Sequence, residues 1–103
     1  MTSDIKKETI AAKNDKFRKT FLGGKVMLTA GVESDENLNK IIAAVKSFDN
    51  FTEENDPHKE KDFGKISIDG EDYFWKIDYY DKDYKFFQVD GHRVLTIMLA
   101  SDY

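Results

Sequence analysis

A short acidic segment in the middle of the chain holds the residues best suited to bind a metal ion. His58, Glu60 and Asp62 alternate with lysines, so an extended backbone would project all three side chains to one side. One imidazole and two or three carboxylates form a ligand set suited to zinc, and also to manganese. The full candidate set, which includes one residue from a facing strand, is Asp56, His58, Glu60, Asp62 and Asp81.

The same segment also fits a simpler interpretation. Asp56-Pro57 is a common way to start a turn, and Lys59 and Lys61 can neutralise the acids locally. If a metal is bound, its role could be structural or catalytic. The chain has no cysteine and only two histidines, which excludes thiolate sites and three-histidine zinc sites.

Aromatic residues crowd into the second half of the chain beside charged ones. They exceed what one face of a sheet can bury, and aromatic side chains next to charges are typical of protein–protein interfaces. We therefore expect a partner-binding surface here, although packing against a helix is the competing interpretation. The candidate residues are Tyr80, Asp81, Asp83, Tyr84, Phe86 and Phe87. Lys76 and Asp78 are a further pair, which could be an acid–base site but is more simply an ion pair.

Asp69-Gly70 is a strong signal for a two-residue hairpin turn. The turn predicts that Ile66 faces Tyr73 and that Gly64 faces Trp75. One face of the hairpin then carries an apolar core stripe, which includes Trp75 and Ile77. The opposite face carries Phe74, Lys76, Asp78 and Tyr80.

The other elements follow from periodicity and turn residues. We expect a first helix capped by Ser3, a strand from Lys25 to Ala30, and a second helix capped by Ser34. An edge strand is predicted over 85–89 and a central strand over 93–100. Together these predict a single α+β domain over residues 1–103, in the order α-β-α-β-β-β. Its four-stranded, mainly antiparallel sheet would carry two helices packed on one face.

Composition limits the possible functions. Charged residues make up 35% of the chain and the net charge is −4, which argues against direct nucleic-acid binding. No apolar run is long enough to span a membrane, and no apolar stretch follows the charges of the first residues. We therefore expect a cytoplasmic protein that does not contact membranes. No phosphate-binding loop or nucleophile elbow is present.

Four blocks of the sequence together resemble a family of short bacterial, plasmid and phage proteins catalogued as a domain of unknown function. Relatives often carry a longer, proline-rich loop between Lys82 and His92, where this chain is shorter and more aromatic. The blocks are Asn14–Arg18 through Gly23-Gly24 to Val32, Phe48 through Asn55-Asp56-Pro57-His58 to Gly64, Trp75–Asp81, and Arg93–Ala100 to Tyr103.

The resemblance implies a context in mobile elements, whose small proteins often block host defences of the restriction or CRISPR type. The leading hypothesis is therefore a non-enzymatic inhibitor that binds a larger host protein. Its partner would be a nucleic-acid-processing defence enzyme with a basic surface, which an acidic protein complements. The alternative is a small metal-dependent hydrolase or nuclease that uses the segment from Asp56 to Asp62.

Overall fold

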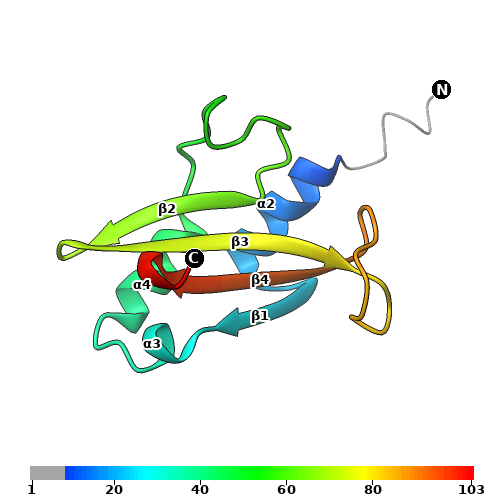
Figure 1. The fold of residues 1–103 in the computed structure, drawn as a ribbon. Helices are drawn as coiled ribbons and strands as arrows, with labels where there is room; N and C mark the ends of the chain where they lie inside the picture. The colour runs from blue at the N-terminus through cyan, green and yellow to red at the C-terminus, as the bar shows by residue number, and fades with distance from the viewer. Residues whose placement is uncertain (1–8) are drawn as a thin grey trace.

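One four-stranded sheet, covered by helices on one face, organises the chain (Figure 1). The computed structural model describes residues 9–103. Strand order is β1-β4-β3-β2, with β1 parallel to β4 and the other neighbours antiparallel. This confirms the predicted α+β class and its element order. The elements are α2 (Ile10–Thr20), β1 (Gly24–Leu28), α3 (Ala30–Glu33), α4 (Leu38–Lys46), β2 (Phe63–Ile68), β3 (Glu71–Tyr80), β4 (His92–Leu99) and the 3-10 turn η1 (Ala100–Asp102).

The hairpin between β2 and β3 forms as its turn residues predict. Asp69 and Gly70 both have positive φ, at 51° and 86°, as a type I′ turn requires. Ile66 therefore pairs with Tyr73 and Gly64 with Trp75. The predicted core stripe is confirmed, because the β3 side chains that face the helices are almost fully buried: Tyr73, Trp75 and Ile77.

Strand β4 lies in the centre of the sheet, between β1 and β3. Its Leu95 and Ile97 are fully buried beneath the helices, together with Ile41 and Val45 from α4 and Phe17 from α2. The second helix, which the periodicity of the sequence predicted, thus packs its apolar side chains into the core. Burying such side chains contributes about 1.5–3 kcal/mol each.

The first helix begins at Ile10, where the side chain of Thr9 accepts a hydrogen bond from the Ala12 amide at 3.1 Å. The predicted cap, Ser3, lies outside the described residues. The helix ends at Phe21, which has a positive φ of 61° and bonds back to the carbonyl of Phe17. No helix of the described chain is both long and apolar enough to cross a membrane.

The prediction that Ser34 caps the second helix is wrong. Ser34 ends the short helix α3, and α4 starts four residues later at Leu38. The reason is Asp35, whose carboxylate accepts bonds from the Asn37 amide at 2.8 Å and from the Tyr73 hydroxyl at 2.6 Å. This carboxylate ties the chain between the two helices to the sheet.

The edge strand predicted over 85–89 is also wrong. Only one isolated bridge forms in this region, between Tyr80 and Phe87. The positive φ angles of Tyr84 and Asp90, 59° and 53°, interrupt an extended backbone. The segment from Asp81 to Gly91, which we call the tip loop, instead projects beyond the end of the sheet (Figure 1).

Candidate functional site

The acidic segment does not continue the hairpin in the predicted register. The Ile77 amide still bonds the Asp62 carbonyl at 2.8 Å, but β2 begins only at Phe63. Upstream, Lys59 and Lys61 have positive φ angles of 57° and 54°. These angles break the alternation on which the predicted alignment of the ligands depended, so that part of the prediction is wrong.

The carboxylate of Asp56 causes this change. It is buried, and its Oδ1 accepts the amides of Glu60 and Lys61, each at 3.0 Å. An aspartate that bonds backbone amides four and five residues ahead winds the chain into a compact turn. Asp56, which precedes Pro57, thus fixes the conformation of the loop.

The remaining candidate metal ligands lie in different places in the structure. Glu60 and Asp62 approach the Tyr79 hydroxyl, with oxygen–oxygen distances of 3.2 and 3.5 Å, whereas the His58 side chain is exposed. Asp81 lies in the tip loop, where its Oδ1 accepts two backbone amides. Within residues 9–103, no three His, Asp or Glu side chains are arranged so that they could hold a metal ion.

Burial and neighbouring charge shape the acid–base properties around Tyr79. Burial, followed by the charge of Glu60, raises the pKa of the Asp62 carboxyl above its usual value. Burial also raises the pKa of the Tyr79 hydroxyl, which therefore stays protonated at neutral pH and donates to these acids. The arrangement is a hydrogen-bonded network that holds the acidic segment against β3.

Asn14 is the centre of this network and lies on the buried face of α2, on the same side as Phe17. It is fully buried. Its amide donates to the Glu60 carbonyl at 2.8 Å and to the Tyr79 hydroxyl at 2.7 Å, and its oxygen accepts from Arg93 Nε at 2.6 Å. One asparagine thus joins α2, the acidic segment, β3 and β4. In the sequence, the feature that could have revealed this network was a polar residue, Asn14, among the apolar residues of the first helix.

Arg93 extends the network to the base of the tip loop. Its guanidinium forms an ion pair with Asp90, which also bonds Lys13 Nζ at 2.9 Å. The hydrogen bond from Lys13, followed by that from Arg93, lowers the pKa of the Asp90 carboxyl below its usual value. The last turn of the tip loop is thereby anchored to α2 and β4.

Inside the tip loop, backbone bonds fix the conformation. The Asp81 amide bonds the Phe86 carbonyl at 2.8 Å, and the Gln88 amide bonds the Tyr79 carbonyl at 3.2 Å. The Asp81 carboxylate accepts the amides of Asp83 and Lys85. These bonds close the loop on itself, so its side chains are presented from an ordered backbone.

Two of the predicted partner-binding aromatics are open to solvent. Phe86 is 71% exposed and Phe87 is 75% exposed, and the neighbouring Val89 is exposed as well. Phe87 stacks on Tyr80, with ring centroids 5.1 Å apart and planes 17° apart. Aromatic residues that the core does not bury are therefore found in the tip loop.

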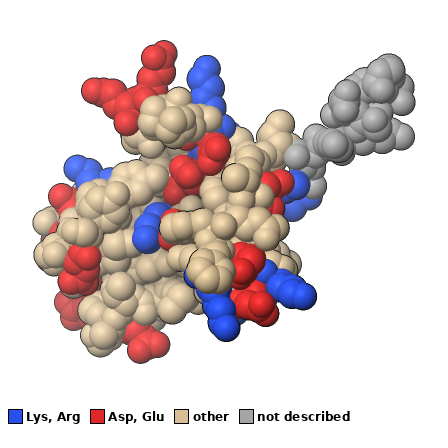
Figure 2. Space-filling model, turned by 45° about the vertical axis from the view of Figure 1, so that its right-hand side comes forward, with Lys and Arg blue, Asp and Glu red and all other residues tan. Residues whose placement is uncertain are grey.

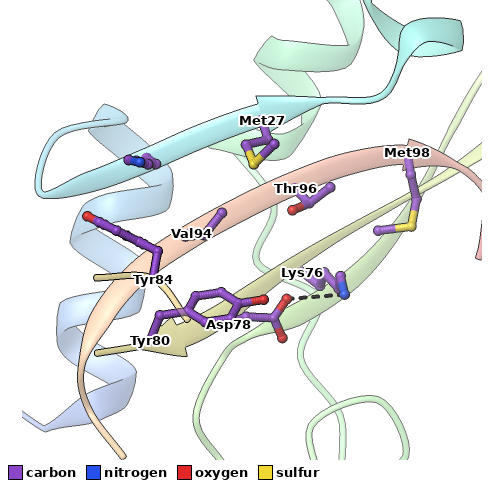
Figure 3. Close-up of a pocket in the computed structure, with 9 residues that line it drawn as sticks. Met27, Lys76, Asp78, Tyr80, Tyr84, Val94, Thr96 and Met98 are labelled. Atoms are coloured by element: carbon purple, nitrogen blue, oxygen red, sulfur yellow. Dashed lines mark ion pairs between the residues drawn. The ribbon is translucent and has the colours of Figure 1, made fainter. Parts of the chain in front are cut away.

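Tyr80 and Tyr84 point in another direction, over the face of the sheet that carries no helix (Figure 3). The Lys25 ammonium lies 4.0 Å from the centre of the Tyr84 ring. Lys76 and Asp78, on the same face, form an ion pair at 3.1 Å. Together these side chains border a groove of about 460 Å³ along β4, which we call the sheet groove.

A family model described as "Protein of unknown function (DUF3768)" matches residues 28–102. The chain belongs to this family. The match spans most of the chain, from the end of β1 through α3, α4, the hairpin, the tip loop and β4 to η1. It therefore includes both the tip loop and most of the sheet groove. The comparisons with curated proteins and with solved structures gave no match.

Proposed function

We propose that this protein is a non-catalytic binding protein that docks on a larger protein through its tip loop. The observation that carries the proposal is the exposure of Phe86 and Phe87 on a loop with a fixed backbone. Transfer of large aromatic side chains from water into an apolar interface with a partner is favourable. An ordered loop also loses little conformational entropy on binding.

The contribution of Phe86 and Phe87 to binding affinity can be estimated from the area of their exposed side chains. Phenylalanine side chains bury roughly 150–250 Å² each in interfaces, so the two together can remove about 300 Å² from water. At about 25 cal/mol per Å², this corresponds to a gross stabilisation of about 7.5 kcal/mol. The costs of association consume part of that gain. We therefore assign about 2 kcal/mol of net affinity to each ring, as is typical of a hot spot.

Charge supports a partner with a basic surface. The net charge of the chain is −4, and Figure 2 shows acidic side chains at several points around the view, some of them beside lysines or arginines. The net negative charge favours encounter with a positively charged partner. Nucleic-acid-processing enzymes have surfaces of this kind. Together with the resemblance to mobile-element proteins, this supports a defence nuclease as the partner, inhibited by occupation of its basic surface.

The test uses the intact protein as immobilised bait in a host lysate. The wild type is compared with a Phe86→Ser/Phe87→Ser variant by quantitative mass spectrometry. The matched control is Leu22→Ser, because Leu22 is as exposed as Phe87 but lies between α2 and β1. We expect a protein that the wild type and the control retain and the double variant loses. With that partner purified, the double variant should bind roughly a thousandfold more weakly.

Equal retention by the wild type and the double variant would reject the tip loop as the docking surface. The metal-dependent hydrolase of the sequence analysis gains no supporting observation from residues 9–103 and stays a prediction.

A further inference from the structure

The sheet groove runs along the side of the sheet that faces away from α2 and α4. Its floor consists of Val94, Thr96 and Met98, the side chains of β4 on that face. Val94 and Met98 are almost fully buried although α2 and α4 cover the opposite face of the sheet. At the Met98 end, the ring of Tyr103 packs on Phe74, the β3 partner of Met98. Side chains from the neighbouring strands must therefore stand above them as walls, and β4 lies at the bottom of a trough.

The strand register shows how the walls are built. Thr96 pairs with Met27 on β1 and with Lys76 on β3. Val94 pairs with Lys25 on β1 and with Asp78 on β3. Val94 and Thr96 are thus each flanked by a wall residue on both sides, whereas Met98 pairs with Phe74 on β3 and lies beyond the end of β1. Two lysines therefore stand on opposite walls, at the levels of Val94 and Thr96, two residues apart along β4.

Two tyrosines limit one end of the groove. Figure 3 shows Tyr80 and Tyr84 at this end and Met98 toward the other. The Lys25 ammonium is held over the Tyr84 ring by a cation–π contact, so its charge stays at the rim. The tyrosine rings and the flat floor bound a space suited to a planar group.

The polar groups determine which kind of molecule the groove can take. Lys25 and Lys76 face one aspartate, Asp78, so the lining has an excess of one positive charge in a protein whose net charge is −4. The floor is apolar except for the Thr96 hydroxyl. A volume of about 460 Å³ lies in the range of small-molecule sites, which combine an apolar lining with a few polar groups. Methionine side chains, here Met27 and Met98, also pack favourably against aromatic rings.

From this geometry and charge we infer that the sheet groove binds a small planar aromatic molecule that carries one anionic group. The aromatic body lies on the β4 floor between the methionines and the tyrosines. The anionic group lies beside the Lys25 ammonium, because the other lysine of the lining, Lys76, is already paired with Asp78. The groove takes Tyr84 from the tip loop and Tyr80, on which Phe87 stacks, but its ligand is a small molecule, so the inference goes beyond the proposed docking of a protein.

Two fluorescent probes test the inference on the full-length protein. Anilinonaphthalene sulfonate is a planar aromatic anion, and phenylnaphthylamine is a neutral molecule of similar shape. We expect the sulfonate to bind with one-to-one saturation and more tightly than the neutral probe. In nitrogen–proton NMR spectra, its largest shift changes should fall on Met27, Lys76 and Thr96.

The variant Lys25→Gln/Lys76→Gln tests the charge directly. It should weaken sulfonate binding by about tenfold, the effect of one lost charge-assisted hydrogen bond, and change neutral-probe binding by less than about twofold. Lys65→Gln is the matched control, since Lys65 is on the same face of the sheet but on the outer strand β2. Phe86→Ser should bind both probes as the wild type does, because Phe86 does not line the groove.

Three results would overturn the inference. The first is sulfonate affinity within about twofold of wild type in the double lysine variant, which is too small for a lost charge-assisted bond. The second is a set of shift changes centred on the tip loop and absent from β4. The third is displacement of the sulfonate by a single-stranded oligonucleotide that binds more tightly, which would make this face a nucleic-acid platform.

Discussion

Replacing Asn14 by alanine should destabilise the protein more than any surface substitution on α2. The side chain is fully buried and makes three hydrogen bonds, two to neutral oxygens and one from the charged Arg93. A neutral bond contributes about 1 kcal/mol, and a bond to a charged group about 2 kcal/mol. The summed loss is about 4 kcal/mol, a large fraction of the roughly 5–15 kcal/mol that stabilises a domain.

The assay is equilibrium urea unfolding followed by far-ultraviolet circular dichroism, with a thermal melt as the second measurement. A loss of about 4 kcal/mol should lower the melting temperature by roughly 15–30 °C in a domain of this size. Lys19→Ala is the control on the same helix, because its exposed ion pair with Asp15 is worth only about 0–1 kcal/mol. A loss below about 1 kcal/mol for Asn14→Ala would refute the assignment of this network as the link between α2 and the sheet.

Four further outcomes follow from the structure. Gly64→Ala should cost about 1–3 kcal/mol in urea unfolding, because the added Cβ would overlap the indole of the facing tryptophan. Asp35→Asn should reduce the fall in melting temperature between neutral and acidic pH. Hydrogen bonding lowers the pKa of Asp35 in the folded state, so its contribution is present above the usual value of 3.8 and disappears as the pH falls through the folded-state pKa. Phe86→Ser/Phe87→Ser should leave the free energy of unfolding within about 0.5 kcal/mol of wild type, since both rings are exposed; a larger drop would give them a structural role. Zinc should not raise the melting temperature, and a rise that His58→Ala removes would revive the metal hypothesis.

Local turn chemistry explains why the hairpin could be predicted. Asp69 and Gly70 adopt the positive φ angles that their turn type needs, and a two-residue turn sets the register of everything after it. The register then places Trp75 in the core without any knowledge of the helices. The apolar stripe of α4 was predictable for a similar reason, because its spacing depends only on helical geometry.

The errors arose where the hydrogen bonds of one carboxylate set the backbone conformation. Asp35 interrupts the second helix because its carboxylate bonds Tyr73, which is 38 residues away. Asp56 winds the acidic segment into a turn, although the alternation of charges there is also typical of a strand. Whether a carboxylate bonds its own backbone or binds a ligand depends on contacts that spacing does not contain.

The sheet groove depends on the pairing of β1 with β4, which the order of elements does not reveal. That parallel pairing brings Lys25 beside Val94 and Met27 beside Thr96. The exposed tip loop was predicted more directly, since aromatic residues such as Phe86 and Phe87 exceeded the capacity of the core. Its internal bonds, which make it a fixed surface, came only from the structure.

Hydrogen exchange of this protein, measured by mass spectrometry with and without the partner that it captures, tests the proposed docking most directly. We predict that the partner slows exchange of the amides in residues 81–91 and leaves the β2–β3 hairpin turn unchanged. Unchanged exchange across 81–91, with protection elsewhere on the chain, would contradict the account.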